Sequence, residues 1–307
     1  MTDIRFDGRT AVVTGAGTGL GRSHALGLAA RGAHVVVNDL GAATDGTGSG
    51  SDAAHAVVAE IRAAGGSALA NGADVADAAQ VEAMVAEAVD TFGSVDILVN
   101  NAGILRDKSF AKMSDADFRK VVEVHLLGSV NCTRAVWPLM ADRQYGRIVM
   151  TTSASGIYGN FGQSNYGAAK AGLVGLMNVL RLEGIRRNIH VNALAPTAAT
   201  RMTEGLLEPE ALELLRPETI TPGLLALVSE AAPTGMILCA GAGCFAETRI
   251  YETAGVALSG AALSPEGVMA AMDRIRAPEG QQRLEDAFSQ TRRFAAMAAA
   301  QCRGGGQ

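Results

Sequence analysis

Three polar residues in one stretch of the sequence have the types and the spacing needed to move a proton. Tyr166 and Lys170 are four positions apart, so on a helix their side chains share a face. A free tyrosine has a pKa near ~10 and is a poor base at neutral pH, but a nearby positive charge favours the phenolate. Ser153 stands thirteen positions before Tyr166, just past an apolar run. We predict that Tyr166 exchanges a proton with a hydroxyl or carbonyl oxygen that Ser153 hydrogen-bonds and orients.

A lone Tyr and Lys pair is more often a solvated helix face, so the prediction depends on a second signal near the start of the chain. The glycine-rich segment Thr14–Gly21 follows the apolar strand Thr10–Val13 and opens a helix expected from Leu20 to Ala30. Glycines at such a turn bring the backbone close to a pyrophosphate, which the free amides at the helix start then bind. We therefore predict a dinucleotide site that includes Gly15, Gly19, Leu20 and Gly21.

The acidic residue at the end of the second strand indicates which dinucleotide is bound. Asp39 directly follows the apolar run Val35–Asn38, at the distance from the glycines that such sites use. Its carboxylate can accept hydrogen bonds from ribose hydroxyls and would repel a 2′-phosphate, and neither Thr18 nor Leu40 supplies a positive charge. The prediction is NAD, whose oxidised nicotinamide would add to the charge that favours the Tyr166 phenolate.

Short apolar runs alternate with helix-length stretches from residue 9 to residue 240, which is typical of a parallel sheet covered on both faces. The fold class is α/β, with a single Rossmann-type doubly wound parallel sheet of seven strands and a C-terminal helical extension. The expected strands are Thr10–Val13, Val35–Asn38, Ser67–Ala70, Ile97–Asn100, Arg147–Thr152, His190–Ala193 and Met236–Cys239.

The predicted domains are residues 1–245, which bind the dinucleotide and carry the catalytic residues, and an extension over residues 246–307. Residues 197–222 break the alternation and contain leucines among Glu and Pro, which fits either a mobile substrate lid or a surface helical hairpin. The loop at residues 40–50, rich in Gly, Ser and Thr, is longer than most strand-to-helix connections. It is either an idle insertion or a segment beside the adenosine.

Composition excludes several other classes of function. The net charge is −5 with no basic run, so nucleic-acid binding is not expected. The apolar runs are too short to span a bilayer, and no signal-peptide core is seen, which predicts a cytoplasmic protein. Four scattered cysteines, with neither a Cys-x-x-Cys pair nor a nearby histidine, predict reduced thiols and no metal site.

With these motifs the chain resembles the short-chain dehydrogenase/reductase family from about residue 8 to residue 243. The motifs are Thr-Gly-x-x-x-Gly-x-Gly at Thr14–Gly21, Asn-Asn-Ala-Gly at Asn100–Gly103, Ser153, and Tyr-x-x-x-Lys at Tyr166–Lys170. The resemblance implies hydride transfer between a nicotinamide and an alcohol or ketone. It also implies roles for further residues: Lys170 on the nicotinamide ribose, Asn101 and Gly103 at the centre of the sheet, Asp74 and Val75 at the adenine, and Pro196 and Thr197 at the carboxamide.

One position departs from the common pattern of the family. Many members place an asparagine where this chain has His125, and its backbone carbonyl binds a water that links the lysine to solvent. Because the main chain does that work, the resemblance implies that His125 can keep the proton relay. Only the contribution of its side chain is left open.

Several runs, among them Val36–Gly41 and Ser153–Gln163, resemble more closely those family members that oxidise (3R)-hydroxyacyl-CoA thioesters, which also carry this histidine. The expected substrate is therefore an acyl-CoA thioester, and the expected assembly is a homodimer or homotetramer. A 17β-hydroxysteroid or another secondary alcohol is the alternative substrate. A dinucleotide-binding regulatory module without turnover is a remote alternative, because it has no need for a tuned phenol.

Overall fold

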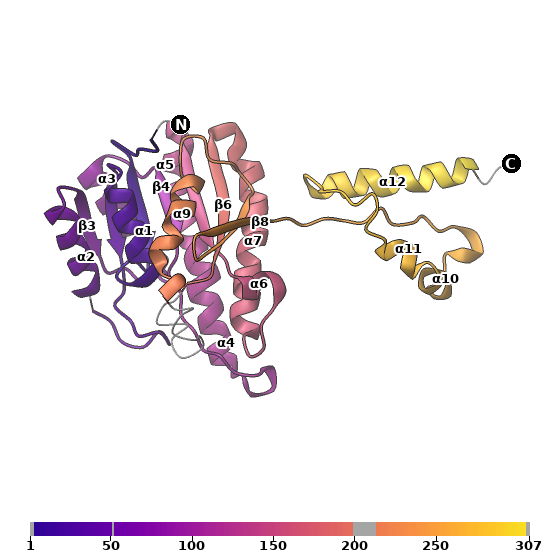
Figure 1. Cartoon of the computed structure of the whole chain (residues 1–307), viewed down its shortest axis with the longest axis horizontal. Coiled ribbons are helices and arrows are strands. Elements are labelled where there is room, and N and C mark those ends of the chain that lie inside the picture. Colours follow the sequence, from indigo (N-terminus) through magenta and orange to yellow (C-terminus); the bar gives the residue numbers. More distant parts are fainter. Residues whose placement is uncertain (1–2, 51, 199–212, 305–307) are drawn as a thin grey trace. The chain divides into compact units, whose positions relative to one another are not determined.

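A computed structural model of the chain describes residues 3–50, 52–198 and 213–304. A single sheet of eight strands forms its centre, in the order β3-β2-β1-β4-β5-β6-β7-β8 (Figure 1). The strands are β1 (Thr10–Thr14), β2 (His34–Asn38), β3 (Ser67–Asn71), β4 (Ile97–Asn100), β5 (Gly146–Thr151), β6 (Ile189–Pro196), β7 (Ile237–Gly241) and β8 (Cys244–Thr248). Strands β1 to β7 are parallel, which confirms the predicted Rossmann-type sheet.

The eighth strand was not predicted. Strand β8 runs antiparallel to β7 and returns through Ala242 and Gly243, which have φ angles of 51° and 74°. Two consecutive positive φ angles are typical of the tight type I′ hairpin turn, whose twist matches that of paired strands. Because Cys244, Phe245 and Ala246 are exposed, β8 has no alternation of buried and exposed residues by which it could be recognised. The predicted domain boundary at residue 245 lies within this strand.

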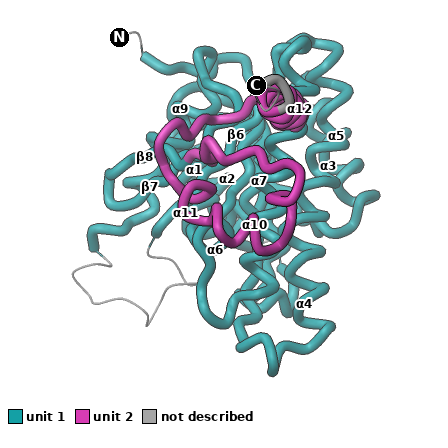
Figure 2. The backbone as a smooth tube through the Cα atoms, turned by 90° about the vertical axis from the view of Figure 1, so that its right-hand side faces the viewer, with its two compact units in different colours: residues 1–248 teal, residues 249–307 magenta. Residues whose placement is uncertain are grey.

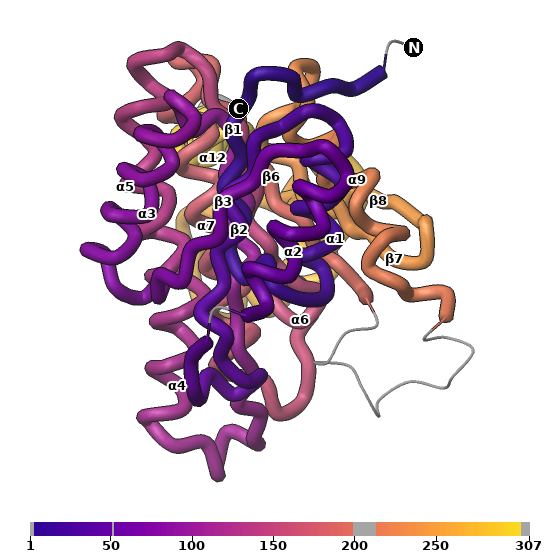
Figure 3. The backbone as a smooth tube through the Cα atoms, turned by 90° about the vertical axis from the view of Figure 1, so that its left-hand side faces the viewer, coloured from indigo at the N-terminus to yellow at the C-terminus, as the bar shows by residue number. Residues whose placement is uncertain are grey.

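Helices cover both faces of the sheet (Figures 1 and 3). One apolar cluster joins the sheet to α1 (Gly19–Ala29), α2 (Asp52–Ala63) and α9 (Thr221–Leu227). The opposite cluster joins it to α3 (Ala78–Phe92), α4 (Asp115–Val122), α5 (Gly128–Arg143) and α7 (Ser164–Gly184). The shorter helical segments of the same unit are η1 (Phe110–Lys112), η2 (Glu123–Leu127), α6 (Ala154–Tyr158), η3 (Ile185–Arg187) and η4 (Pro217–Thr219).

The valines of β1 and β2 show why the strand sequences are uniformly apolar. Val13, Val35 and Val37 point into the first cluster, whereas Val12 and Val36 point into the second. Successive side chains of a strand face opposite sides, so a sheet that is covered on both sides buries every residue of its central strands. A continuous run of β-branched residues results.

The strand order places the ends of β1 and β4 at a switch point. The chain adds β2 and β3 on one side of β1 and then crosses to add β4 to β7 on the other side. At such a point the connections after two neighbouring strands leave on opposite faces, and a crevice opens at the carboxyl ends of the strands. The glycine-rich segment follows β1 and the Asn-Asn-Ala-Gly segment follows β4, so both border this crevice.

The chain divides into two compact units, residues 1–248 and residues 249–307 (Figure 2). The second unit contains η5 (Gly260–Ala262), α10 (Pro265–Ala270), α11 (Met272–Arg276) and α12 (Ala287–Gly304). Arg293 of α12 holds it together through an ion pair of 2.6 Å with Glu252 and a hydrogen bond to the Thr253 carbonyl. Most of the predicted lid, including Met202, lies outside the described residues. Within the described parts of the chain, no helix combines the length and apolarity needed to cross a membrane.

Candidate active site

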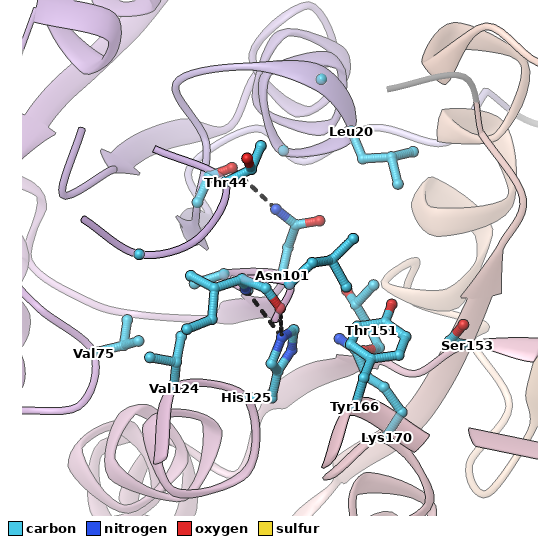
Figure 4. Close-up of a pocket in the computed structure, with 18 of the residues that line it drawn as sticks. Leu20, Thr44, Val75, Asn101, Val124, His125, Thr151, Ser153, Tyr166 and Lys170 are labelled. Atoms are coloured by element: carbon cyan, nitrogen blue, oxygen red, sulfur yellow. Dashed lines mark hydrogen bonds between the residues drawn. The ribbon is translucent and has the colours of Figure 1, made fainter. Parts of the chain in front are cut away.

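A cavity of about 460 Å³ opens at the carboxyl ends of the strands, and every residue predicted for the site lines it. The predicted catalytic residues on its wall are Ser153, Tyr166, Lys170 and His125, and the predicted dinucleotide-binding residues are Gly15, Gly19, Leu20, Gly21, Asp39, Asp74, Val75, Asn101, Gly103, Pro196 and Thr197. They come from eight separate segments of the chain. The parallel sheet gathers them at one edge, and Figure 4 shows several of them around the cavity.

The glycine-rich turn after β1 needs glycine for two different reasons. Gly15 has a φ of 62°, in the left-handed region that favours glycine. Gly21 has no such angle, but a Cβ there would lie 2.1 Å from the Gly15 carbonyl oxygen. The turn is therefore packed too tightly for side chains. Helix α1 begins beside it, and the Thr18 side chain makes no capping hydrogen bond, which leaves the first amides of the helix to face an anion.

Backbone amides fix the Asp39 carboxylate at the end of β2. One carboxylate oxygen accepts a hydrogen bond from Gly17 N and the other accepts one from Gly41 N, each at 2.7 Å. Two amide donors on different oxygens hold the carboxylate in a fixed orientation. A negative charge with a defined direction therefore stands at the edge of the cavity next to the glycine-rich turn.

Asn101 ties the ends of β1 and β4 together at the switch point. Its side-chain amide donates to the Thr14 and Gly15 carbonyls at 2.9 and 3.0 Å, and its backbone amide donates to Thr14 Oγ1 at 3.0 Å. These bonds connect segments far apart in the sequence and satisfy backbone groups that the sheet leaves unpaired. They set the position of the glycine-rich turn relative to the segment that continues toward His125.

Tyr166 and Lys170 lie on one face of α7, as the spacing predicts, and Ser153 lies opposite them at the end of β5 (Figure 4). Lys170 Nζ is 5.5 Å from the centre of the Tyr166 ring and donates to the Thr151 carbonyl at 2.5 Å. Thr152 Oγ1 donates to the Lys170 carbonyl at 2.7 Å, which fixes the helix to the strand end. Ser153 caps α6 by accepting from Ser155 N at 3.2 Å.

The protein groups around Tyr166 and Lys170 by themselves disfavour both charged forms, whereas the sequence prediction also counted the charge of an oxidised nicotinamide. Burial raises the pKa of Tyr166, while a hydrogen bond with Ser153 lowers it and the Asp107 charge raises it. Burial lowers the pKa of Lys170 to about 7, so near neutral pH this lysine carries only part of a positive charge. A phenol with a lowered pKa therefore requires more positive charge than these protein groups supply by themselves.

His125 contributes its imidazole as well as its backbone. The segment η2 is a π-helix, in which Gly128 N donates to the Glu123 carbonyl, and Ser129 Oγ donates to the His125 carbonyl at 2.7 Å. The ring Nε2 lies 2.8 Å from the Ile104 carbonyl and 3.0 Å from the Ile104 amide. The ring also meets Tyr166 edge to face, with centroids 5.2 Å apart.

Burial and the Lys170 charge hold the pKa of His125 well below its usual range, so the ring is neutral. A neutral Nε2 can either donate to the Ile104 carbonyl or accept from its amide, but not both at once. In either arrangement Nδ1 has no partner and one of the two Ile104 backbone groups is left without the ring. The side chain that sequence reasoning left open is thus a buried contact between η2 and the segment after β4.

The other predicted contacts also line the cavity. Asp74 accepts a hydrogen bond from Ala76 N at 2.9 Å, and the neighbouring Val75 is buried. Pro196 ends β6, and Thr197 N continues the ladder to the Ala240 carbonyl at 2.8 Å. Leu20, in the first turn of α1, projects its side chain toward the same space (Figure 4).

Sequence reasoning missed several residues of the cavity wall. Four of them, Ala42, Ala43, Thr44 and Gly46, belong to the glycine-rich loop after Asp39, whose position was left open. Others follow known motifs by a few positions: Ile104, Leu105, Asn160 and Gln163. Lys120 of α4 also lines the wall and pairs with Glu123 at 3.3 Å. Closeness to a strand end is the signal that would have indicated the residues after β4 and β5.

Comparison with known sequences identifies relatives over most of the chain. Peroxisomal multifunctional enzyme type 2 of Mus musculus is 50% identical over 275 residues, which are 89% of this chain and 37% of that protein. Peroxisomal hydratase-dehydrogenase-epimerase of Saccharomyces cerevisiae is 48% identical over 254 residues, 82% of this chain and 28% of that protein. The chain thus spans about a third of the length of these two relatives.

Solved structures agree with the sequence comparison. Full-length peroxisomal multifunctional enzyme type 2 from Drosophila melanogaster superposes with a TM-score of 0.81 at 37% identity, covering 97% of this chain and 50% of that one. A 7α-hydroxysteroid dehydrogenase, complexed with NADH and 7-oxo glycochenodeoxycholic acid, superposes with a TM-score of 0.71 at 33% identity, covering 79% of this chain and 98% of that one. Residues 9–211 match the short chain dehydrogenase family, so the chain belongs to the short-chain dehydrogenase/reductase family of oxidoreductases.

Proposed function

We propose that the protein is an NAD-dependent dehydrogenase that interconverts (3R)-3-hydroxyacyl-CoA and 3-oxoacyl-CoA thioesters, as in the β-oxidation of fatty acids or side chains. The observation that carries the proposal is the similarity of 89% and 82% of this chain to parts of two peroxisomal enzymes, one of which is named as a dehydrogenase. The cavity in which Ser153, Tyr166 and Lys170 meet also supports the proposal.

The cavity wall fits a nicotinamide dinucleotide. The tightly packed glycines of the turn and the uncapped start of α1 would bind its pyrophosphate, and the structural neighbour of known ligand holds NADH. The hydrogen bonds from two backbone amides keep the Asp39 carboxylate where ribose hydroxyls would bind. The flanking Thr18 and Leu40 carry no positive charge that could bind a 2′-phosphate. These features favour NAD over NADP.

The protein's own residues would handle the proton of the substrate hydroxyl. Ser153 Oγ donates a hydrogen bond to the substrate oxygen and orients it toward Tyr166, whose phenolate takes the hydroxyl proton. The dinucleotide supplies the acceptor for the hydride that leaves the carbinol carbon as the C=O bond forms. The partly charged Lys170, held by the Thr151 carbonyl, stabilises the phenolate before the proton arrives.

Two measurements test this function. The first compares kcat/KM for NAD and NADP, and equal values or a preference for NADP would refute the cofactor choice. The second follows NADH formation with both enantiomers of 3-hydroxybutyryl-CoA, with a short thioester that lacks CoA, and with a 17β-hydroxysteroid. We expect turnover of the (3R) thioester and much poorer use of the truncated one, because binding energy from the nucleotide end is lost.

A hydroxysteroid dehydrogenase is the second candidate, favoured by the steroid-bound structural neighbour. Turnover of the steroid alone in the same assay would give the function to this candidate. Turnover of only the (3S) thioester would refute the stereochemical part of the first proposal.

We further propose a homodimer or homotetramer that forms through the helices containing His125 and Tyr166. Leu127 of η2 and Val179 and Leu182 of α7 are exposed large apolar side chains on these elements, and an interface would remove them from water. Light scattering of the purified protein measures the mass, and a monomer at micromolar concentration would contradict the proposal.

A further inference from the structure

The glycine-rich loop after β2 is a closed structure with a narrow neck. Gly50 N donates to the Leu40 carbonyl at 2.8 Å, and a Cβ on Gly41 would lie 1.6 Å from the Gly50 carbonyl oxygen. The two ends of the loop therefore touch. Inside it, Ala43 N donates to the Thr47 carbonyl at 2.8 Å, and the Asp45 side chain accepts from Thr47 N at 2.9 Å.

This loop, residues 41–50, forms part of the cavity wall and contacts the segment that follows β4. Leu105 N donates to the Thr44 carbonyl at 2.8 Å. Gly46 packs so closely on Ile104 that an added Cβ would lie 3.1 Å from its Cδ1. Figure 4 shows Thr44 beside the same space that Asn101 and His125 border. The loop thus reaches from the end of one central strand to the segment after another.

Arg106 holds this contact through its side chain. Its Nε donates to the Asp45 carbonyl at 2.8 Å, across 61 positions of the sequence, and its Nη1 pairs with Asp117 of α4 at 3.3 Å. The side chain is about three-quarters buried, since 24% of it is exposed. A planar guanidinium can hold two partners in fixed directions, so Arg106 connects the loop to the body of the domain.

The backbone of Arg106 leads directly to the catalytic helix. Asn165 is fully buried, and its side-chain amide donates to the Arg106 carbonyl at 3.0 Å. The oxygen of the same side chain accepts from Tyr166 N at 2.7 Å. One residue therefore contacts both the loop on the cavity wall and the side chain that fixes the backbone of Tyr166.

We propose that loop 41–50 is a clasp that retains the dinucleotide. Arg106 is the positioning residue that keeps the loop closed and fixes its position relative to α7. The inference rests on the dinucleotide binding of the proposed function. A free loop of this composition samples many conformations, and ordering it on binding would weaken affinity. A loop ordered beforehand removes that loss and slows release of the ligand.

Four variants test the clasp. They are Arg106→Ala, deletion of residues 42–49 so that Gly41 joins Gly50 across the neck, the combination of both, and the control Arg119→Ala. Arg119 is a neighbouring arginine on α4 that pairs with Asp115 at 2.6 Å and is 78% exposed. Stopped-flow fluorescence measures the Kd and the dissociation rate of NADH, and thermal melting confirms that each variant is folded.

We expect Arg106→Ala to raise the Kd of NADH by about tenfold or more, which is the loss that removal of one charge-assisted hydrogen bond produces. Most of the change should be in the dissociation rate. The loop deletion should weaken binding at least as much, and adding Arg106→Ala to it should change little, because the Asp45 carbonyl is then already gone. Arg119→Ala should bind NADH as the wild type does.

Three results would overturn the clasp: an unchanged Kd in the loop deletion, an equal loss in Arg119→Ala, or an Arg106→Ala effect that persists at full size in the deletion background. The deletion leaves Arg106 itself intact, so the test stands even if Arg106→Ala does not fold. A wild-type protein that binds NADPH in place of NADH would refute only the cofactor choice of the proposed function, and the same variants would then test the clasp with NADPH.

Discussion

Gly103 and His125 form a pair whose fit can be measured. A Cβ added to Gly103 would lie 2.2 Å from His125 Cε1, 2.8 Å from Nδ1 and 3.0 Å from Nε2. Gly103 is not among the glycines with positive φ, so alanine meets no backbone strain there. The cost of Gly103→Ala must therefore come from the imidazole, which is 2% exposed and held by the Ile104 backbone.

The magnitude follows from overpacking and from its relief. Forcing a methyl group into a packed site costs about 1–3 kcal/mol, and we expect about 2 kcal/mol for Gly103→Ala. His125→Ala leaves Ile104 without its partner and opens a hole, which costs about 2 kcal/mol. In the double variant the methyl group enters the space of the ring, so the sum of about 4 kcal/mol should fall to about 2 kcal/mol.

Urea unfolding of the four proteins measures this cycle, with unchanged m-values as the condition for comparing free energies. Gly72→Ala is the control, because Gly72 has neither a positive φ nor any atom within 4 Å of an added Cβ, and it should stay within about 0.5 kcal/mol of the wild type. Additive losses, within about 0.5 kcal/mol, would show that the ring does not confine Gly103.

Three further predictions concern catalysis and pH. Tyr166→Phe should lower kcat at least about a hundredfold while NADH binding changes little, whereas Lys170→Ala should impair both, as steady-state rates and NADH titration would show. The rate of substrate oxidation should rise with pH through one ionisation shared by Tyr166 and Lys170. His125→Asn should keep that pH profile, because the buried imidazole stays neutral. Loss of the alkaline rise in this variant would place the ring in the mechanism. Burial lowers the pKa of His24 from 6.5 to about 3, so between these two pH values only the unfolded chain binds the proton, and folding stability falls as the pH falls. From pH 7 to pH 5, His24→Gln should therefore lose about 2 kcal/mol less than the wild type in urea unfolding, and parallel losses would contradict a neutral His24.

The part of the site that could be predicted consists of local patterns. The spacing of Tyr166 and Lys170 fixes their shared helix face whatever the rest of the protein does. The glycines after β1 and the acid after β2 follow strand ends that apolar runs mark plainly. Because parallel strands end at one edge, these local signals were enough to predict that the glycines, Asp39, Ser153, Tyr166 and Lys170 lie together. The remaining site residues were predicted from the family resemblance: His125, Asn101, Gly103, Asp74, Val75, Pro196 and Thr197.

Where prediction failed, the deciding contacts join distant segments. Strand β8 exists because β7 offers it an edge, although its own exposed residues carry no pattern. The pKa of Tyr166 is raised because burial outweighs the Ser153 hydrogen bond, and burial cannot be counted from spacing. Lys170, whose positive charge was expected to favour the Tyr166 phenolate, is itself buried, and burial lowers its own pKa.

The sequence by itself determined the fold class, the edge of the sheet that carries the site and the residue types that meet there, since each depends on periodicity or on spacing within one element. Only the tertiary structure decided that the His125 ring fills the space beside Gly103 and that Arg106 meets Asp45 across 61 positions. Such contacts depend on how side chains from separate strands and loops share one volume. No local pattern encodes that sharing, because it arises only when the whole sheet has formed.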